Sequence, residues 1–310
     1  MTRPLGGEPE RHEPAPGLFL FDLPQPLPGF RRFVSAWFFV DDRGRRVLVD
    51  PGPASSIPFL LGGLEPLTDG LDLVLLTHIH LDHSGGLKAL CARYPDAAVL
   101  AHRRAARHLM DPSRLWNASL ATLGPVAQAY GEPEPIDGAR LIFEDEAGLV
   151  EVLETTGHAS HHLSFRVSCG GRRLLFAGEA AGLSLPTEDG EMWLRPASPP
   201  PFDATAALGS LDRLERFLEG DELFCYAHWG AVEGSLERVA LAKRQIQDWL
   251  EVVRSMQDEP LETIVDRLMA KDPFLRASIP DDLRERERIF MGNSVRGFLG
   301  FLRSEGYVRR

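Results

Sequence analysis

Residues 73–86 read Leu73-Val74-Leu75-Leu76-Thr77-His78-Ile79-His80-Leu81-Asp82-His83-Ser84-Gly85-Gly86. The apolar first half is typical of a buried strand, and the second half is dominated by ligand-type and turn residues, with three histidines and an aspartate. Imidazole and carboxylate groups are the usual ligands of zinc and other divalent metals. His78 and His80 point the same way if the extended geometry continues through them, while Asp82 and His83 can aim at a second point. One loop is therefore expected to supply ligands to two metal ions.

The alternative interpretation of this loop is a polar turn whose histidines only form ordinary hydrogen bonds. That interpretation suits a lone histidine better than four ligand-type residues at this spacing. The pattern His-x-His-x-Asp-His after an apolar strand and Thr77 resembles the metal-binding signature of the metallo-β-lactamase superfamily. The resemblance implies an α/β fold of the four-layer α+β type, an αβ/βα sandwich with a metal site, often dinuclear, at one edge. The motif is specific for the fold and weak for the substrate.

The remaining ligands of that family occur downstream in the expected order. His158 follows a strand and Gly157, as in the family's Gly-His motif, and His228 follows the apolar run 223–227. His162 matches a later histidine that is generally structural in the family. His161 stands where the family usually has glycine, and its role is left open.

Glu179 is the position at which the sequence departs from the family. It follows Leu174-Leu175-Phe176-Ala177-Gly178, where the resemblance implies an aspartate that bridges both metals. A glutamate also offers two oxygens, but its extra methylene must be accommodated. This departure affects what the resemblance implies for the metal–metal distance and for the occupancy of the second site. It affects the existence of a metal site less.

The resemblance implies two divalent ions, with zinc expected and iron or manganese as alternatives. The first would take His78, His80 and His158, the second Asp82, His83 and His228, with Glu179 bridging. Asp82 is also expected to be catalytic, accepting a proton during turnover.

Other residues receive weaker assignments. Asp50, in the family's first Asp-x-Gly motif, is expected to support the metal loop, although an aspartate that only begins a turn fits equally well. Cys225 lies an odd number of strand positions from His228, which places it in the core, whereas Tyr226 shares the face of His228. Arg195 can meet a carboxylate or phosphate of a ligand or simply bond loop carbonyls.

The composition excludes several classes of function. The chain has 310 residues, 45 acidic against 34 basic side chains and a net charge of −11, which disfavours nucleic acid as a partner. No apolar run approaches the roughly 20 residues of a membrane span. Three scattered cysteines indicate reduced thiols and a cytoplasmic protein. We expect a small-molecule substrate, no membrane partner, and a homodimer as an option.

The domain organisation is expected to have three parts. Residues 1–16 are polar and proline-rich and predict a flexible N-terminus, 17–234 the metallo-β-lactamase-like domain, and 235–310 a C-terminal helical extension. Residues 102–124 are expected to be helical, and residues 183–203 an irregular segment bordering the substrate cleft. In the extension, helices are expected from residue 235, after Pro260, after a cap at 278–281, and over 295–302.

The expected function is a metal-dependent hydrolase that attacks an ester, thioester or lactone with a hydroxide activated by a dinuclear metal site. The ligand set is similar to the glyoxalase II and lactonase branches. The alternative is an iron-dependent oxidoreductase or sulfur dioxygenase, in which His78, His158 and Glu179 hold one iron. A non-catalytic scaffold is disfavoured because every ligand position retains a coordinating side chain.

Overall fold

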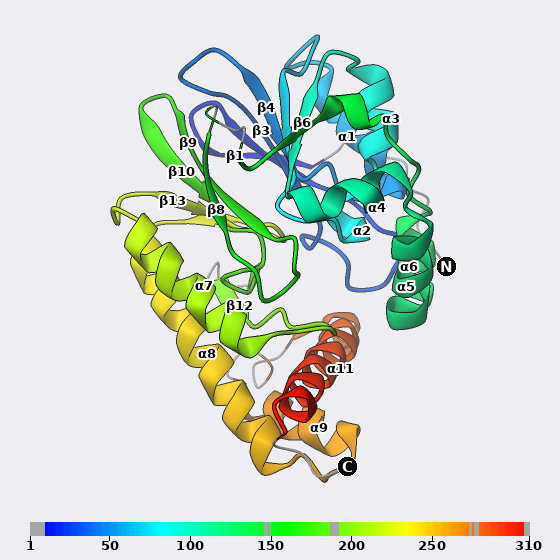
Figure 1. Ribbon diagram of the computed structural model, residues 1–310, viewed down its shortest axis with the longest axis vertical. Helices are drawn as coiled ribbons and strands as arrows, with labels where there is room; N and C mark the ends of the chain where they lie inside the picture. The colour runs from blue at the N-terminus through cyan, green and yellow to red at the C-terminus, as the bar shows by residue number, and fades with distance from the viewer. Residues whose placement is uncertain are drawn as a thin grey trace.

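Two β-sheets face each other and carry helices on their outer sides in the computed structural model (Figure 1). The structure describes residues 10–145, 148, 150–186, 192–272, 275 and 279–306. The expected αβ/βα four-layer sandwich with a helical C-terminal region is confirmed.

The first sheet has the strand order β1-β2-β3-β4-β5-β6-β7. Its strands are β1 Arg11–Ala15, β2 Leu18–Asp22, β3 Ser35–Val40, β4 Arg46–Val49, β5 Leu73–Leu75, β6 Ala98–Ala101 and β7 Leu141–Phe143. The first four strands pair antiparallel, and β4 to β7 pair parallel. Helices α1 (Ile57–Leu64), α2 (Leu81–Ser84) and α3 (Leu87–Arg93) lie in the connections between parallel strands.

The expectation of a flexible N-terminus over residues 1–16 is wrong for its last part. Residues 11–15 pair with β2 as an edge strand, so the sheet begins before residue 17. The prolines that suggested a loop are tolerated there because an edge strand leaves one row of backbone groups unpaired. Residues 1–9 lie outside the described residues.

The second sheet has the order β14-β13-β10-β9-β8. Its strands are β8 Glu151–Glu154, β9 Leu163–Cys169, β10 Arg172–Phe176, β13 Leu223–Cys225 and β14 Ala231–Val232. The two inner faces meet in an apolar core that includes Trp37, Phe39 and Phe176. The rings of Phe39 and Phe176 are stacked with centroids 5.4 Å apart. Cys225 is buried in this core, as predicted.

Helices of the region after β6 are shorter than expected. Residues 102–124 contain η2 (Arg103–Ala105), α4 (Ala106–Met110) and α5 (Ser113–Leu123), and α6 (Pro125–Tyr130) follows. The break falls at Asp111, which has extended backbone dihedrals, because the residue before a proline avoids the helical region.

Residues 183–203 are more regular than the sequence indicates. Strands β11 (Leu183–Pro186) and β12 (Met192–Arg195) pair antiparallel. Among the described residues of the segment, 196–203 lack regular structure. The irregular assignment was therefore wrong for these strands. They form a separate two-stranded sheet, and the prolines around it obscured the pattern.

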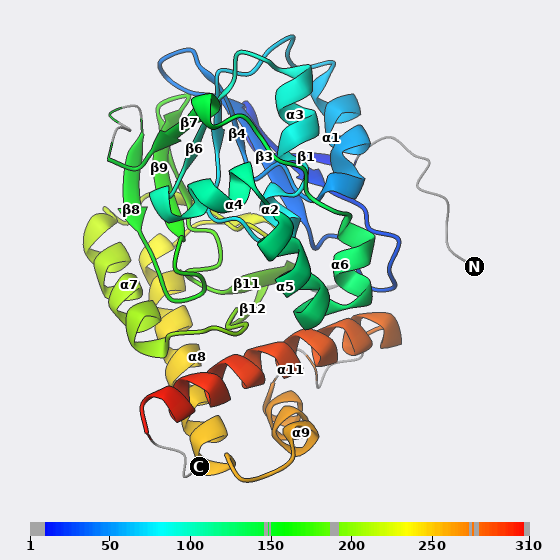
Figure 2. The ribbon, with the colours of Figure 1, turned by 45° about the vertical axis from the view of Figure 1, so that its right-hand side comes forward.

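Helix α8 (Ser235–Ser255) of the extension lies beside α7 (Ala204–Phe217) near the second sheet, whereas α9 (Leu261–Lys271) and α11 (Asp281–Ser304) lie farther from that sheet (Figure 2). Helices α7 and α8 share an apolar core with β10 and β13, and α9 and α11 complete it. The two helices expected after residue 278 are one continuous helix, α11, and residue 278 of the expected cap lies outside the described residues. Glycines 292, 297 and 300 lower helix propensity but do not end the helix, because one face of it is buried.

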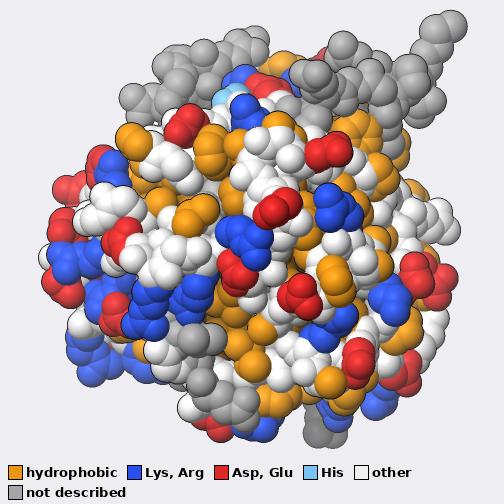
Figure 3. Space-filling model, turned by 90° about the horizontal axis from the view of Figure 1, so that it is seen from above, with side chains coloured by type: hydrophobic (Ala, Val, Ile, Leu, Met, Phe, Trp, Pro, Cys, Tyr) orange, Lys and Arg blue, Asp and Glu red, His pale blue; other side chains and the backbone are white. Residues whose placement is uncertain are grey.

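None of the described helices is long and apolar enough to cross a membrane. The end of the molecule away from α9 and α11 carries acidic and basic side chains side by side, with scattered apolar ones (Figure 3). That face therefore does not concentrate one sign of charge.

Candidate metal centre

All seven predicted metal ligands converge at one end of the two sheets. Residues 78–83 follow β5, Glu179 follows β10 and His228 follows β13, each at the carboxyl end of its strand. His158 lies in the connection from β8 to β9. The ligand atoms fall into two main groups, and within each group the atoms lie within 4.8 Å of one another.

The first group consists of three histidines. The Nε2 atom of His78 lies 2.9 Å from Nδ1 of His80 and 3.2 Å from Nε2 of His158, and the last two atoms are 3.0 Å apart. Nitrogens bound to one tetrahedral zinc at its usual bond length would be about 3.3 Å apart. The three lone pairs thus meet at the spacing that one ion requires.

The second group combines two histidines with two carboxylates. Oε1 of Glu179 lies 3.0 Å from Nε2 of His83 and 2.9 Å from Nε2 of His228. Oδ2 of Asp82 lies 3.6 Å and 3.8 Å from the same two nitrogens. The expected second ligand set is therefore assembled, with Glu179 as its fourth member.

Glu179 does not belong to the group of His78, His80 and His158. Its Oε2 lies 3.5 Å from Nδ1 of His78, the nitrogen that faces away from the other two histidines. Oε2 of Glu179 has no hydrogen-bond partner among the described residues. The bridging role of Glu179 stays a prediction.

Hydrogen bonds on the far side of each ring fix which nitrogen is free for a metal. Nδ1 of His158 donates to the carbonyl of Ala197 at 2.9 Å, and Nδ1 of His228 donates to the carbonyl of Phe33 at 2.9 Å. A carbonyl only accepts, so both Nδ1 atoms carry the proton and both Nε2 atoms present a lone pair. Such bonds orient ligating histidines in metal sites.

Asp50 supports the loop from below, as predicted. Its Oδ1 accepts from the backbone N–H of Thr77 at 2.8 Å, and its Oδ2 accepts from Thr77 Oγ1 at 2.6 Å and from His83 Nδ1 at 3.1 Å. Since the Thr77 hydroxyl proton is used, Thr77 Oγ1 accepts from His78 Nδ1 at 3.1 Å. Asp50 thereby sets the orientation of one histidine in each group.

His162 holds Glu179 in place. Its Nδ1 contacts Thr155 Oγ1 at 2.9 Å, and its Nε2 accepts from the backbone N–H of Glu179 at 3.2 Å. Gly178 has φ +53°, and a Cβ there would collide with the His162 ring, so glycine is required at this turn. The structural role expected for His162 fits these contacts.

Burial and charge set the protonation states that a metal needs. Burial lowers the pKa of His78, His80 and His158 below the ordinary value, so their neutral forms predominate. Although burial alone would raise it, the surrounding histidines hold the pKa of Glu179 well below its usual range. Burial alone would lower the pKa of His83, but the carboxylates of Glu179 and Asp82 raise it well above the ordinary value. A divalent cation would take the place of that proton, and the donor set therefore fits divalent metal ions.

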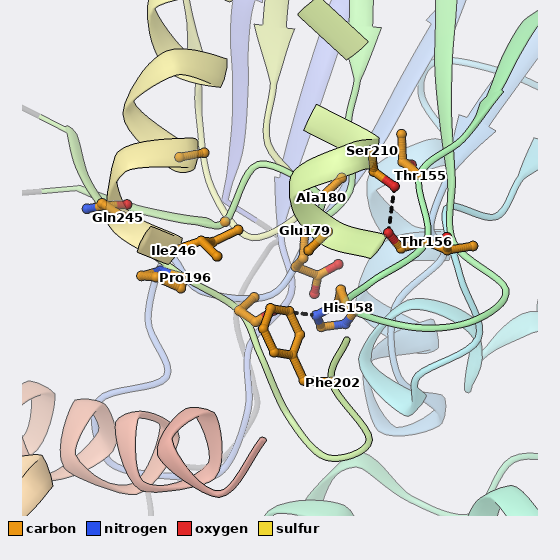
Figure 4. A pocket seen from close by; sticks show the side chains of 14 residues that line it. Thr155, Thr156, His158, Glu179, Ala180, Pro196, Phe202, Ser210, Gln245 and Ile246 are labelled. Carbon is orange, nitrogen blue, oxygen red and sulfur yellow. Dashed lines mark hydrogen bonds between the residues drawn. The ribbon is translucent and has the colours of Figure 1, made fainter. Parts of the chain in front are cut away.

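Figure 4 shows the rear of the site, where the Glu179 carboxylate and the His158 ring point toward one another. The bond from His158 to the 195–198 segment and the bond from Ser210 Oγ to the carbonyl of Thr156 are drawn there. This side is closed by α7 and α8, which contribute Ser210, Gln245 and Ile246. Access to the ligands is therefore from the opposite side.

On that side a cavity of about 220 Å³ borders both ligand groups. Its walls come from α5, from the proline-rich segment after β12, and from α11, with His161 also in the lining. The segment 183–203 thus borders the cleft, as expected. The C-terminal extension supplies Phe290 and Asn293, which the sequence did not indicate because generic residues at helical spacing give no signal for a pocket.

Two weaker expectations have different outcomes. Arg195 lines the cavity but is buried and paired with Glu287. Tyr226 does not line it; its side chain packs in the core against the ring of Phe224, with centroids 4.6 Å apart. The strand ends at Cys225, so the two-residue alternation that linked Tyr226 to His228 does not continue through the turn.

Comparison with known proteins decides the family. The model of the metallo-β-lactamase superfamily matches residues 29–228, which contain all seven ligands. The chain belongs to the metallo-β-lactamase superfamily. With this donor set, it is a hydrolase of that superfamily with a divalent-metal site.

The curated relatives include hydroxyacylglutathione hydrolases. That of Stenotrophomonas maltophilia is 31% identical over 145 residues, 46% of this chain and 44% of that protein. That of Hahella chejuensis is 27% identical over 270 residues, 82% of this chain and 86% of that protein. The match with the former spans less than half of that relative's length.

Solved structures share the fold at low identity. A metallo-β-lactamase superfamily protein of Sulfolobus tokodaii has a TM-score of 0.66 at 22% identity, over 91% of this chain and 98% of that one. A metallo-β-lactamase family protein of Thermus thermophilus has a TM-score of 0.62 at 24% identity, over 94% of this chain and 95% of that one. Since these likenesses cover more than nine-tenths of this chain, they include at least part of the C-terminal helical region.

Proposed function

We propose that the protein hydrolyses a thioester, or a related ester or lactone, with two divalent metal ions. The observation that carries the proposal is the pair of adjoining ligand groups, His78-His80-His158 and Asp82-His83-Glu179-His228, at the floor of one cavity. The hydroxyacylglutathione hydrolases among the relatives favour a thioester.

Divalent ions held by these groups would supply an activated water and polarise the carbonyl of the substrate. The chain itself contributes orientation and proton handling. Asp82 is partly exposed to the cavity, and its Oδ2 faces the second ligand group at 3.6 Å from His83, so its other carboxylate oxygen is left to accept a proton. His158 and His228 are held by backbone carbonyls and cannot rotate away.

The placement of Glu179 bears on the iron-dependent oxidoreductase alternative. That alternative needs His78, His158 and one carboxylate around a single ion. The Glu179 carboxylate instead lies with His83 and His228, which supports the hydrolase.

The test combines metal analysis with a substrate panel. Protein purified without added metal is expected to hold about two zinc ions per chain and to release thiol from a thioester without consuming oxygen. His80→Ala should abolish the release. One iron per chain together with oxygen uptake would contradict the proposal, and so would the failure of metal-replete protein to cleave any thioester, ester or lactone.

A further inference from the structure

A buried cluster of three charged side chains lies beside the cavity. Arg195 is 1% exposed and its Nε donates to Oε2 of Glu287, which is fully buried. Nε and Nη2 of Arg286 donate to the other oxygen of Glu287 at 2.9 Å and 2.8 Å. Two guanidinium groups against one carboxylate leave one surplus positive charge in the cluster, and an unmatched charge is costly to bury.

The incomplete member of the cluster is Arg195. Its Nη2 has no hydrogen-bond partner within the described part of the chain. Its guanidinium carbon lies 5.6 Å from the centre of the Phe290 ring, and both residues line the cavity. A buried donor without an acceptor loses its water without compensation, so an anion in the cavity would satisfy both the donor and the surplus charge.

A second donor, the side-chain amide of Asn293, lies on the same face of α11 as Phe290. Asn293 is three residues after Phe290 and also lines the cavity. Its Oδ1 accepts from Arg296 Nη1 at 2.9 Å, which orients the amide so that Nδ2 is the group left to donate. No acceptor for Nδ2 is found in the described residues.

The remainder of the cavity wall is mainly apolar, with the hydroxyl groups of Ser119, Thr122, Ser198 and Ser294 between the apolar side chains. It includes Leu115, Leu123, Leu183 and Pro199 to Pro201. The metal ligands lie close by, because His158 donates to the carbonyl of Ala197, two residues after Arg195. Two residues span at most roughly 7 Å of extended chain. Arg195 and the metal ligands also border one cavity of about 220 Å³, so a single short ligand can contact both.

We propose that Arg195 and Asn293 bind a carboxylate at the far end of the substrate, so that the substrate is a short acyl thioester or ester with a terminal carboxylate. The acyl carbonyl would lie at the metal centre, and the methylene chain would lie against the apolar wall. The assignment of the cleaved bond rests on the proposed function, whereas binding of the carboxylate does not.

The test measures binding and turnover separately on the full-length, metal-loaded protein. Isothermal titration with monomethyl adipate and dimethyl adipate compares one carboxylate with its neutral ester. The wild type is expected to bind the monoacid roughly 10- to 100-fold more tightly, the size of one hydrogen bond to a charged group. Arg195→Lys and Asn293→Leu are each expected to reduce that ratio by about tenfold.

Arg166→Lys is the matched control. Arg166 also pairs with a fully buried glutamate, Glu222, but it does not line the cavity. This variant should keep the wild-type ratio, which separates loss of the subsite from a general loss of stability. If Arg195→Lys fails to fold, Asn293→Leu carries the test alone.

The outcomes are distinguishable. A ratio near one in the wild type overturns the subsite, because the carboxylate then adds no affinity. A wild-type ratio in both variants also overturns it, since the carboxylate would then rest on the metal ions or on ordered water. A ratio that falls in the variants supports it, even if no thioester is cleaved and the proposed function fails. Where the thioester is cleaved, the variants should raise KM for the ω-carboxy acyl substrate more than they lower kcat.

Discussion

Asp50→Asn is the substitution that tests how the metal loop is oriented. The carboxylate of Asp50 is 1% exposed and accepts three hydrogen bonds, two from Thr77 and one from His83. An amide has one acceptor oxygen, so its NH2 group must face at least one donor. Asp50 has φ +50°, a conformation that asparagine also tolerates, and the substitution therefore adds no backbone strain.

The expected consequence is weaker metal binding at the second ligand group. If the amide NH2 replaces Oδ2, His83 can avoid the clash only by moving its proton from Nδ1 to Nε2, the nitrogen that faces Glu179. A protonated Nε2 cannot bind a metal ion. Loss of such an outer partner typically lowers metal affinity by about 10- to 100-fold, or roughly 1.4–2.7 kcal/mol. The folded state should also lose about 1–3 kcal/mol for the unsatisfied buried donor.

The assay is a zinc titration against a chromophoric chelator, which resolves a stronger and a weaker site. Asp50→Asn should weaken one site and leave the stoichiometry measurable, while thermal unfolding of the metal-free protein reports the stability loss. Asp42→Asn is the control, because Asp42 accepts from the backbone of Gly171 at an exposed turn far from the ligands. If both zinc constants remain at wild-type values, the orienting role of Asp50 is refuted.

Three further substitutions test separate features. Glu179→Asp withdraws the carboxylate by about one C–C bond length, roughly 1.5 Å, and should lower kcat/KM for a thioester by about 10²-fold; unchanged kinetics would show that the longer side chain is not needed. Asp22→Asn should stabilise the protein at pH 8 by at most about 3 kcal/mol, because burial raises the pKa of Asp22 from 3.8 to about 6. The folded state thus binds that proton more tightly, so the stability that this group gives the wild type falls as pH rises through 6. Urea unfolding should show that the difference in unfolding free energy between variant and wild type shrinks toward pH 4. A difference that stays constant with pH would contradict this. Gly178→Ala should lower Tm much more than Gly171→Ala does, since both glycines have positive φ but a Cβ only at Gly178 would meet a side chain, that of His162. Equal losses of Tm would show that the contact with the His162 ring is unimportant.

Much of the site was readable in the sequence because its ligands come from short motifs at strand ends. His78 to His83 lie within six residues, and their chemistry and spacing predict a metal loop before any contact is known. Each later ligand follows a strand, and that strand is apolar for Glu179 and His228; the carboxyl ends of strands in a layered α/β fold gather at one edge. The position of Glu179 as a departure from the family was likewise visible in sequence.

The division of the ligands between two metals was implied by the resemblance, but the atoms through which each group meets depended on tertiary structure. Which oxygen of Glu179 faces His228, and which nitrogen of His158 is held by Ala197, follow from contacts between residues tens of positions apart. The same is true of the continuous helix α11: the sequence predicted two separate helices after residue 278, but burial of one helix face outweighs the low helix propensity of the glycines between them.

The sequence by itself determined the fold, the family and the set of candidate metal ligands. Only the tertiary structure decided the substrate cavity, because its wall joins α5, the segment after β12, and α11, which lie far apart along the chain. Arg195 illustrates the difference. The sequence left open whether Arg195 meets a ligand anion or only bonds loop carbonyls. The structure adds that Glu287 pairs with it, that Phe290 lies beneath it and that one of its donors is left unpaired within the described residues. Pairings of that kind depend on three-dimensional packing, which no local pattern encodes.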